Sequence, residues 1–121
     1  MIYGRVRFGR EAMVPIAIHG RRQSRIEAVL DTGFTGHLCL AARLQRRMLL
    51  RRRGDVEMDL ADGHRVKQPA YVGEVSFAGG RQTVLVTLTR LADSLLGTSL
   101  LAGKRVSVDF VRCGSVVISD A

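Results

Sequence analysis

The residues that could do chemistry lie in the stretch 26–36, I-E-A-V-L-D-T-G-F-T-G, where an apolar run ends at Asp31. Asp, Thr and Gly are common turn residues, so one interpretation is a plain turn. The other is that a buried strand holds the Asp31 carboxylate still for acid–base catalysis. Gly33 suits the second interpretation, because a residue without a Cβ lets backbone N–H groups approach the carboxylate.

A fixed carboxylate is most useful as one of a pair. Hydrolysis of an amide needs an activated water and a proton donor for the leaving nitrogen. Two carboxyl groups that share one proton supply both, because like charges at close range cannot both ionise. The chain contains one Asp-Thr-Gly, and no other aspartate stands in a comparable frame. A paired site would therefore need Asp31 from two chains related by a two-fold axis.

The elements that position this stretch are expected to be mainly strands. Short Val- and Ile-rich runs punctuated by glycine are typical of a β protein. One helix is predicted at 41–50, with Leu44 and Met48 on its apolar side and Gly54 ending it. The predicted strands are residues 13–18, 25–30, 37–40, 56–60, 65–68, 72–77, 83–88, 106–110 and 115–119.

Two hairpin turns are also predicted. Asp62-Gly63, within L-A-D-G-H at 60–64, is a typical hairpin signal. Ala78-Gly79-Gly80 separates two further strands. A plain surface turn remains the alternative for the first hairpin.

Three features together resemble a known family. These are D-T-G-F-T-G at 31–36, L-L-G-T-S-L-L at 95–101 and the hairpin between them; E-V-S-F-A-G-G-R-Q-T-V-L-V at 74–86 also fits. They resemble the retropepsin-like aspartic proteases, a single-domain family that includes retroviral proteases and bacterial relatives. The resemblance runs from about residue 13 to residue 118. It implies an all-β fold, a small closed barrel with one short helix, in a single domain spanning residues 1–121.

The resemblance implies an aspartic endopeptidase that acts on a peptide or protein substrate as a homodimer. Its terminal strands, particularly Val116–Ser119, would pair with the partner chain. The expected site residues are the catalytic Asp31, Thr32 and Gly33, the supporting Thr35, Leu95, Leu96 and Gly97, and a substrate-covering flap at Leu60, Ala61, Asp62 and Gly63.

Individual positions carry further expectations. Thr32 would bond across the two-fold axis to the partner loop. Phe34 departs from the small residue often found in that frame, and Thr35 is the alternative donor of a hydrogen bond to the carboxylate. Leu95-Leu96-Gly97 would pack against the catalytic loop, with Gly97 allowing close approach, although an ordinary helix start remains the alternative.

The net charge is +8, and all of the 19 basic residues except Lys67 and Lys104 are arginine. They cluster at 21–25 and 43–53. The expected consequence is a solvated basic surface. The alternative function is a catalytically silent module of this fold that contacts nucleic acid or acidic partners through the arginine clusters. Few aromatic residues are present to stack bases, and no nucleic-acid-binding signature appears, which disfavours nucleic acid as a partner.

The remaining sequence features argue against other classes. Cys39 and Cys113 are expected to be buried free thiols in a reducing cytoplasm. No apolar run approaches the roughly 20 residues of a membrane span, and no secretory signal is apparent. His19, His37 and His64 lack metal-ligand spacing, so neither a metal nor a cofactor is expected.

Overall fold

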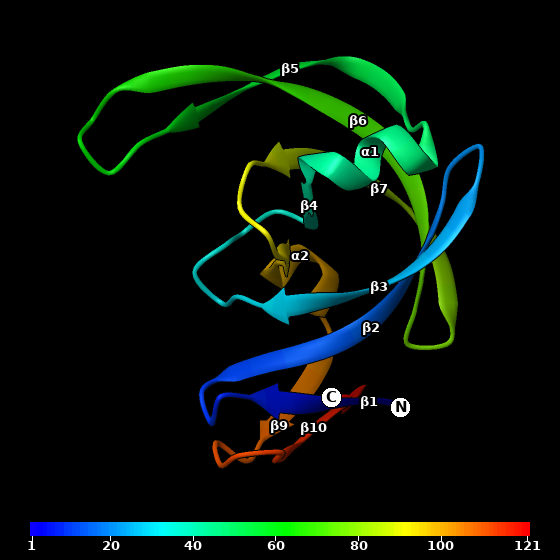
Figure 1. Cartoon of the computed structure of the whole chain (residues 1–121), viewed down its shortest axis with the longest axis vertical. Helices are drawn as coiled ribbons and strands as arrows, with labels where there is room; N and C mark the ends of the chain where they lie inside the picture. The colour runs from blue at the N-terminus through cyan, green and yellow to red at the C-terminus, as the bar shows by residue number, and fades with distance from the viewer.

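The computed structural model describes all residues, 1–121, and is dominated by strands (Figure 1). The helices are α1 (Ala42–Met48) and α2 (Thr98–Leu101). The strands are β1 (Ile2–Arg7), β2 (Glu11–His19), β3 (Gln23–Leu30), β4 (Leu38–Ala41), β5 (Arg51–Asp59), β6 (Arg65–Phe77), β7 (Gly80–Thr89), β8 (Ser94–Leu96), β9 (Lys104–Val108) and β10 (Ser115–Asp120). The predicted all-β fold is confirmed.

All ten strands belong to one sheet, in the order β5-β6-β7-β4-β8-β3-β2-β1-β10-β9. An additional pairing of β2 with β6, through Ala17 and Ser76, closes the strands from β6 to β2 into a ring. The short β8 runs parallel to β3 on one side and antiparallel to β4 on the other. The segment that carries Leu95 and Leu96 is therefore an inner strand of the sheet.

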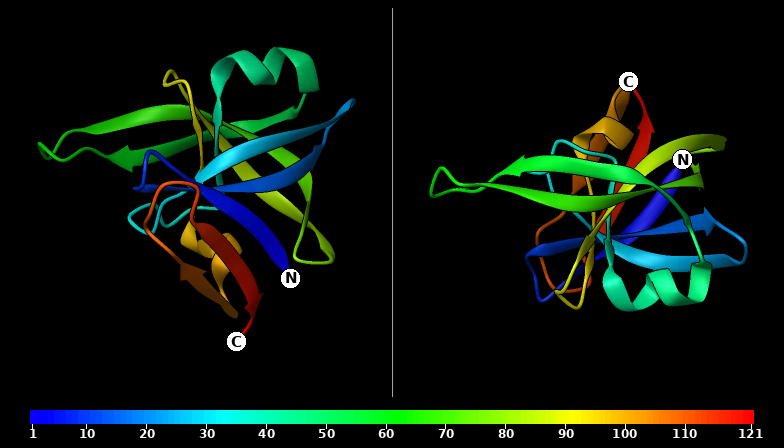
Figure 2. Two further views of the ribbon diagram at one scale, coloured as in Figure 1. Left: turned by 60° about the horizontal axis from the view of Figure 1, so that its bottom comes forward. Right: turned by 90° about the horizontal axis from the view of Figure 1, so that it is seen from above.

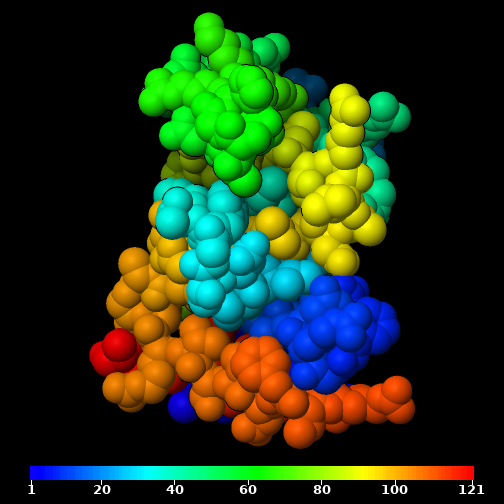
Figure 3. Space-filling view, turned by 90° about the vertical axis from the view of Figure 1, so that its left-hand side faces the viewer, coloured from blue at the N-terminus to red at the C-terminus, as the bar shows by residue number.

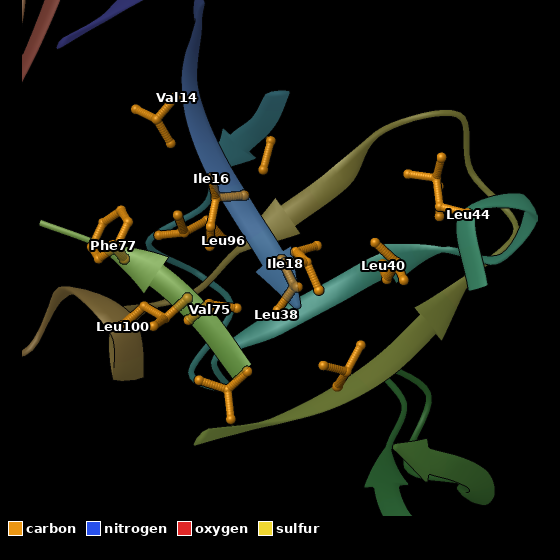
Figure 4. Close-up of a cluster of buried hydrophobic side chains, with 14 of the residues drawn as sticks. Val14, Ile16, Ile18, Leu38, Leu40, Leu44, Val75, Phe77, Leu96 and Leu100 are labelled. Atoms are coloured by element: carbon orange, nitrogen blue, oxygen red, sulfur yellow. The ribbon is translucent and has the colours of Figure 1, made fainter. Parts of the chain in front are cut away.

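The core is a single cluster of apolar side chains inside this ring. Figure 4 shows Ile16 from β2, Leu96 from β8 and Leu100 from α2 in the same cluster, and each is at most 2% exposed. Along β2, buried residues alternate with half-buried ones, which is the period of a strand with one face on the core. The core thus anchors β8 directly, and β8 in turn borders the strand that leads to Asp31.

The helix α1 ends earlier than predicted. Leu49 adopts the left-handed conformation at φ 53°, and its N–H bonds to the carbonyl of Gln45 at 2.9 Å. The Gln45 side chain donates a hydrogen bond to the Leu50 carbonyl and accepts one from the Leu50 N–H. The Leu50 side chain is buried. Gly54, predicted to end the helix, lies instead at an irregularity of β5 with φ 150°.

Three other elements differ from the sequence-based expectation. Residues 65–68 and 72–77 form one continuous strand, β6, in which Pro69 lies opposite Asp55. The T-S-L-L segment is a second short helix, α2. The N-terminal strand β1 was not among the predicted strands; it is held by β2 on one side and β10 on the other.

The C-terminal strand β10 has no free edge. It pairs with β1 through Val116 and Val117, and with β9 through the same residues from the opposite side. Within one chain both edges of residues 116–118 are thus occupied, and the expected pairing of Val116–Ser119 with a partner chain stays a prediction. The free edges of the sheet are β5 and β9.

The cysteines also differ from expectation. Cys39 is half-buried on β4, and burial raises the pKa of its thiol. Cys113 is exposed in the loop before β10, in a left-handed conformation at φ 58°. Both thiols are free, as predicted. Neither α1 nor α2 has the length that a helix needs to cross a membrane.

Candidate active site

Asp31 leaves the sheet at the point where β3 meets β8. Leu30 is the last residue of β3 and pairs with Leu96 of β8 in the parallel register. The backbone N–H of Asp31 donates to the Leu96 carbonyl at 2.9 Å. Since Leu96 is fully buried, the start of the Asp31 loop is attached to the core itself.

The carboxylate is oriented by the tight turn that follows. The Gly33 N–H donates to Asp31 Oδ1 at 2.9 Å, and the Phe34 N–H donates to the Asp31 carbonyl at 3.2 Å. The side chain of Asp31 remains half-exposed, while Thr32 and Gly33 are exposed. One carboxylate oxygen is thus fixed by a backbone donor, and the group is open to solvent and to a second molecule.

The residues 34–37 and 97–99 are joined by their backbones. Gly97 N–H donates to the His37 carbonyl at 2.9 Å, Thr98 N–H to Phe34 at 2.9 Å and Ser99 N–H to Gly36 at 3.2 Å. The Ser99 hydroxyl adds a bond to the Thr35 carbonyl at 2.5 Å. Leu95-Leu96-Gly97 therefore combines both expectations: Gly97 is the N-cap residue of α2, and it also packs against the Asp31 loop.

Gly97 is required by this close approach. A Cβ at this position would lie 2.1 Å from the Gly36 carbonyl oxygen and 2.7 Å from the Phe34 ring. A Cβ on Gly36 would likewise meet the Phe34 ring at 2.7 Å. Phe34 therefore fills the space beside two glycines, which accounts for a large residue at a position where a small one was expected.

The structure brings most of the predicted site residues together. Asp31, Gly33 and Gly97 meet as described, but the Thr35 hydroxyl makes no hydrogen bond and only its carbonyl is used. Neither Phe34 nor Thr35 donates a side-chain hydrogen bond to the carboxylate. Ser99 was missed as a supporting residue, although the polar T-S after L-L-G was visible in the sequence. His37, which lies close after the triplet, contributes its backbone carbonyl.

The hairpin between β5 and β6 extends on the same side of the molecule as the Asp31 loop (Figures 1 and 3). Its end is closed by hydrogen bonds from Leu60 N–H to the His64 carbonyl and from Gly63 N–H to the Leu60 carbonyl. Asp62 accepts bonds from the His64 N–H and ring, which hold the pKa of its carboxyl below the ordinary value. Asp62 is thus a turn-forming residue, and Leu60, Ala61 and Gly63 are exposed beside it.

Comparison with known proteins identifies the fold. No protein-family model matches the sequence, and no curated protein sequence matches it. A retropepsin-like aspartic protease from Rickettsia conorii superposes with a TM-score of 0.62 at 20% identity, over 96% of this chain and 88% of the other. The simian foamy virus (mac) protease superposes with a TM-score of 0.53 at 17% identity, over 73% of this chain and 91% of the other.

The chain has the retropepsin-like fold. Within this fold, three surface hollows are lined by residues other than 31–36.

One support of the Asp31 loop was not apparent in the sequence. Arg7 at the end of β1 forms a two-pronged ion pair with Asp93, at 2.7 and 3.3 Å, and a second pair with Glu11. Asp93 directly precedes β8, so this ion pair joins β1 to the start of β8. The other end of β8, at Leu96, accepts the hydrogen bond from the Asp31 N–H. Arg7 keeps the pKa of the Asp93 carboxyl below its ordinary value.

We predict that Gly97→Ala lowers the free energy of unfolding by about 3 kcal/mol, because the new methyl group overlaps the Gly36 carbonyl. Gly80→Ala is the matched control, since its Cβ would meet nothing nearer than 3.8 Å. Urea denaturation of both variants measures the difference. An equal decrease in the free energy of unfolding of Gly97→Ala and Gly80→Ala would show that the contact at Gly97 is not tight.

We predict that Asp93→Asn lowers the free energy of unfolding by about 1 kcal/mol at neutral pH, a small value because both side chains are about one-third exposed. The folded-state pKa of Asp93 is depressed, so this stabilisation is present above the ordinary carboxyl pKa and is lost as the pH falls through the folded-state value. Denaturation at a series of pH values measures it.

The matched control for this pair is Asp59→Asn, which removes a more exposed ion pair with Arg65. Its expected effect is close to zero at every pH. The free energies of unfolding of the wild type and of Asp93→Asn should converge toward acid pH. A gap between them that grows toward acid pH would contradict a depressed pKa for Asp93.

Proposed function

We propose that the protein is an aspartic endopeptidase whose active site is completed by a second copy of the chain. The observation that carries the proposal is the Asp31 loop: an oriented, half-exposed carboxylate at the end of an inner strand, with one such loop in each chain. A homodimer with its two-fold axis between the loops would bring two Asp31 carboxyl groups together.

The proposed reaction uses the two carboxyl groups in complementary states. One is ionised and accepts a proton from water as the water oxygen bonds to the peptide carbonyl carbon. The other is neutral and donates its proton to the leaving nitrogen as the C–N bond breaks. The products are a new carboxyl group and a new amino group, and the pair again holds one shared proton.

The supporting groups have defined roles in this proposal. The Gly33 N–H holds one oxygen of each Asp31, leaving the other oxygen for water. The exposed Thr32 is free to bond to the partner loop. The hairpin at Leu60–Gly63 is the proposed flap: it would cover an extended peptide, exclude water and add backbone hydrogen bonds.

The surface around the Asp31 loop favours contact with a second copy. The adjoining segments carry four exposed apolar side chains, which we call the apolar rim: Phe8, Leu91, Phe110 and Val111, each 61–69% exposed. Figure 3 shows the β1–β2 turn, the β7–β8 loop and the β9–β10 loop around the Asp31 loop on this face. Apolar patches of this kind mark protein interaction sites. The rim adds to the expected pairing of Val116–Ser119 as a proposed dimer contact.

The decisive variant is Asp31→Asn. The amide keeps an oxygen for the Gly33 N–H, so the fold and the dimer are retained, but it cannot exchange protons. Peptidase activity is expected to fall by roughly 10²–10⁴-fold. Cleavage of a diverse peptide mixture between about pH 4 and 7 measures this by mass spectrometry. An Asp31→Asn protein that cleaves at the wild-type rate would exclude the mechanism.

The dimer is tested separately by Phe110→Glu. A charge in the apolar rim is expected to weaken self-association by about tenfold or more and to reduce activity in parallel. Leu49→Glu, at an exposed apolar position beyond α1, is the matched control and should change neither. Sedimentation equilibrium combined with peptide cleavage measures both effects. A monomeric wild-type protein that cleaves peptide would contradict a site shared by two chains.

A further inference from the structure

Arginines from three separate segments meet on the side of the molecule opposite the Asp31 loop. We call this surface the arginine face; it comprises Arg21 and Arg22 of the β2–β3 turn, Arg46 and Arg47 of α1, and Arg51 and Arg53 of β5. Figures 1 and 2 show the turn, the end of α1 and the start of β5 side by side in every view. The Arg22 N–H reaches the Met48 carbonyl at 3.4 Å.

Tertiary packing enforces this convergence. A Cβ on Gly20 would lie 2.5 Å from the Met48 carbonyl and 2.9 Å from the Leu50 side chain, so the turn presses directly on the end of α1. Leu50 and Met48 are buried beneath it. The backbones of the turn and of the end of α1 are therefore held together by the core.

All six arginines are exposed, and none takes part in an ion pair or a side-chain hydrogen bond. Residues 19–22 and 42–53 contain no acidic residue. Of the nearby acidic residues, Asp55 forms an ion pair with Arg52, and Glu74 of β6 forms one with Arg81. The arginine face therefore carries uncompensated positive charge that repels itself and attracts a polyanion.

The face also contains a hollow of about 540 Å³. Leu50 and Val72 line it together with Gln45. Arg21 and Arg51 are among its lining residues. Arginine suits a phosphate group there, because its planar fork can donate two parallel hydrogen bonds to phosphate oxygens.

The composition of the face distinguishes among polyanions. It contains no aromatic side chain on which an unpaired base could stack, which disfavours single-stranded nucleic acid. Leu49 is its only large exposed apolar side chain, too little to insert into a lipid surface. Regularly spaced phosphates on a rigid helix fit it best, since they need only arginine forks for binding.

We propose that the arginine face binds the phosphate backbone of duplex nucleic acid without regard to sequence. The bound duplex lies away from the Asp31 loop and the hairpin, so it leaves that site open. The binding does not depend on peptidase activity, and it would localise the protein on nucleic acid.

The test measures fluorescence anisotropy of a labelled DNA duplex of about 20 base pairs between about 50 and 200 mM NaCl. All proteins carry Asp31→Asn, so the outcome is independent of any proteolysis. With six phosphate contacts, the slope of log K against log salt is expected to be about −5. The face variant Arg21→Gln/Arg47→Gln/Arg51→Gln should reduce the slope to about −3 and weaken binding about tenfold or more.

The matched control is Arg5→Gln/Arg90→Gln/Arg105→Gln, which removes the same charge from exposed, unpaired arginines elsewhere. It should bind within about threefold of the parent. Equal weakening by both triple variants would overturn the proposal, as would no duplex binding at the lowest salt. Vesicles containing phosphatidylserine form a further arm, and binding to them as tight as to the duplex would overturn the assignment to nucleic acid.

Discussion

The backbone contact between the Asp31 loop and the segment after β8 is the constraint on which the rest of the site depends. Asp31 donates to Leu96, and Gly97, Thr98 and Ser99 donate back to residues 36–37 and 34. These bonds require the two segments to touch without intervening side chains, and so they require glycine at position 97. Backbone groups of this irregular loop thus find hydrogen-bond partners, as those of a strand do.

This constraint links the core to the chemistry. Leu96 is fully buried, and its carbonyl is the acceptor for Asp31. At the other end of β8, the ion pair with Arg7 secures Asp93, which directly precedes the strand. The orientation of the carboxylate therefore rests on packing and on an ion pair as well as on the turn that contains it.

The surface of the molecule divides into two regions with different physical character. The face with the Asp31 loop carries the apolar rim, which favours association with another protein surface. The opposite side carries the unpaired arginines, which favour a polyanion. Since the two regions lie apart, a chain could use both at the same time.

Much of the fold was predictable from local patterns. Alternating apolar residues marked the strands, Leu44 and Met48 marked the buried side of α1, and Asp62-Gly63 and Ala78-Gly79-Gly80 marked the hairpins, because these signals act over a few residues. The end of α1 was misplaced, since Leu49 entered the left-handed conformation to let Leu50 reach the core. The strand β1 was missed because its neighbours, β2 and β10, come from both ends of the chain.

By itself the sequence determined which residues could form the site: Asp-Thr-Gly after an apolar run, and Leu-Leu-Gly some sixty residues later. Only the tertiary structure decided how they meet, why Phe34 fits between two glycines, and that Arg7 supports β8. It also decided that β10 is enclosed and that separate arginine clusters become one face. The physical reason is that these contacts join residues far apart in the chain, and their geometry depends on how the whole sheet closes.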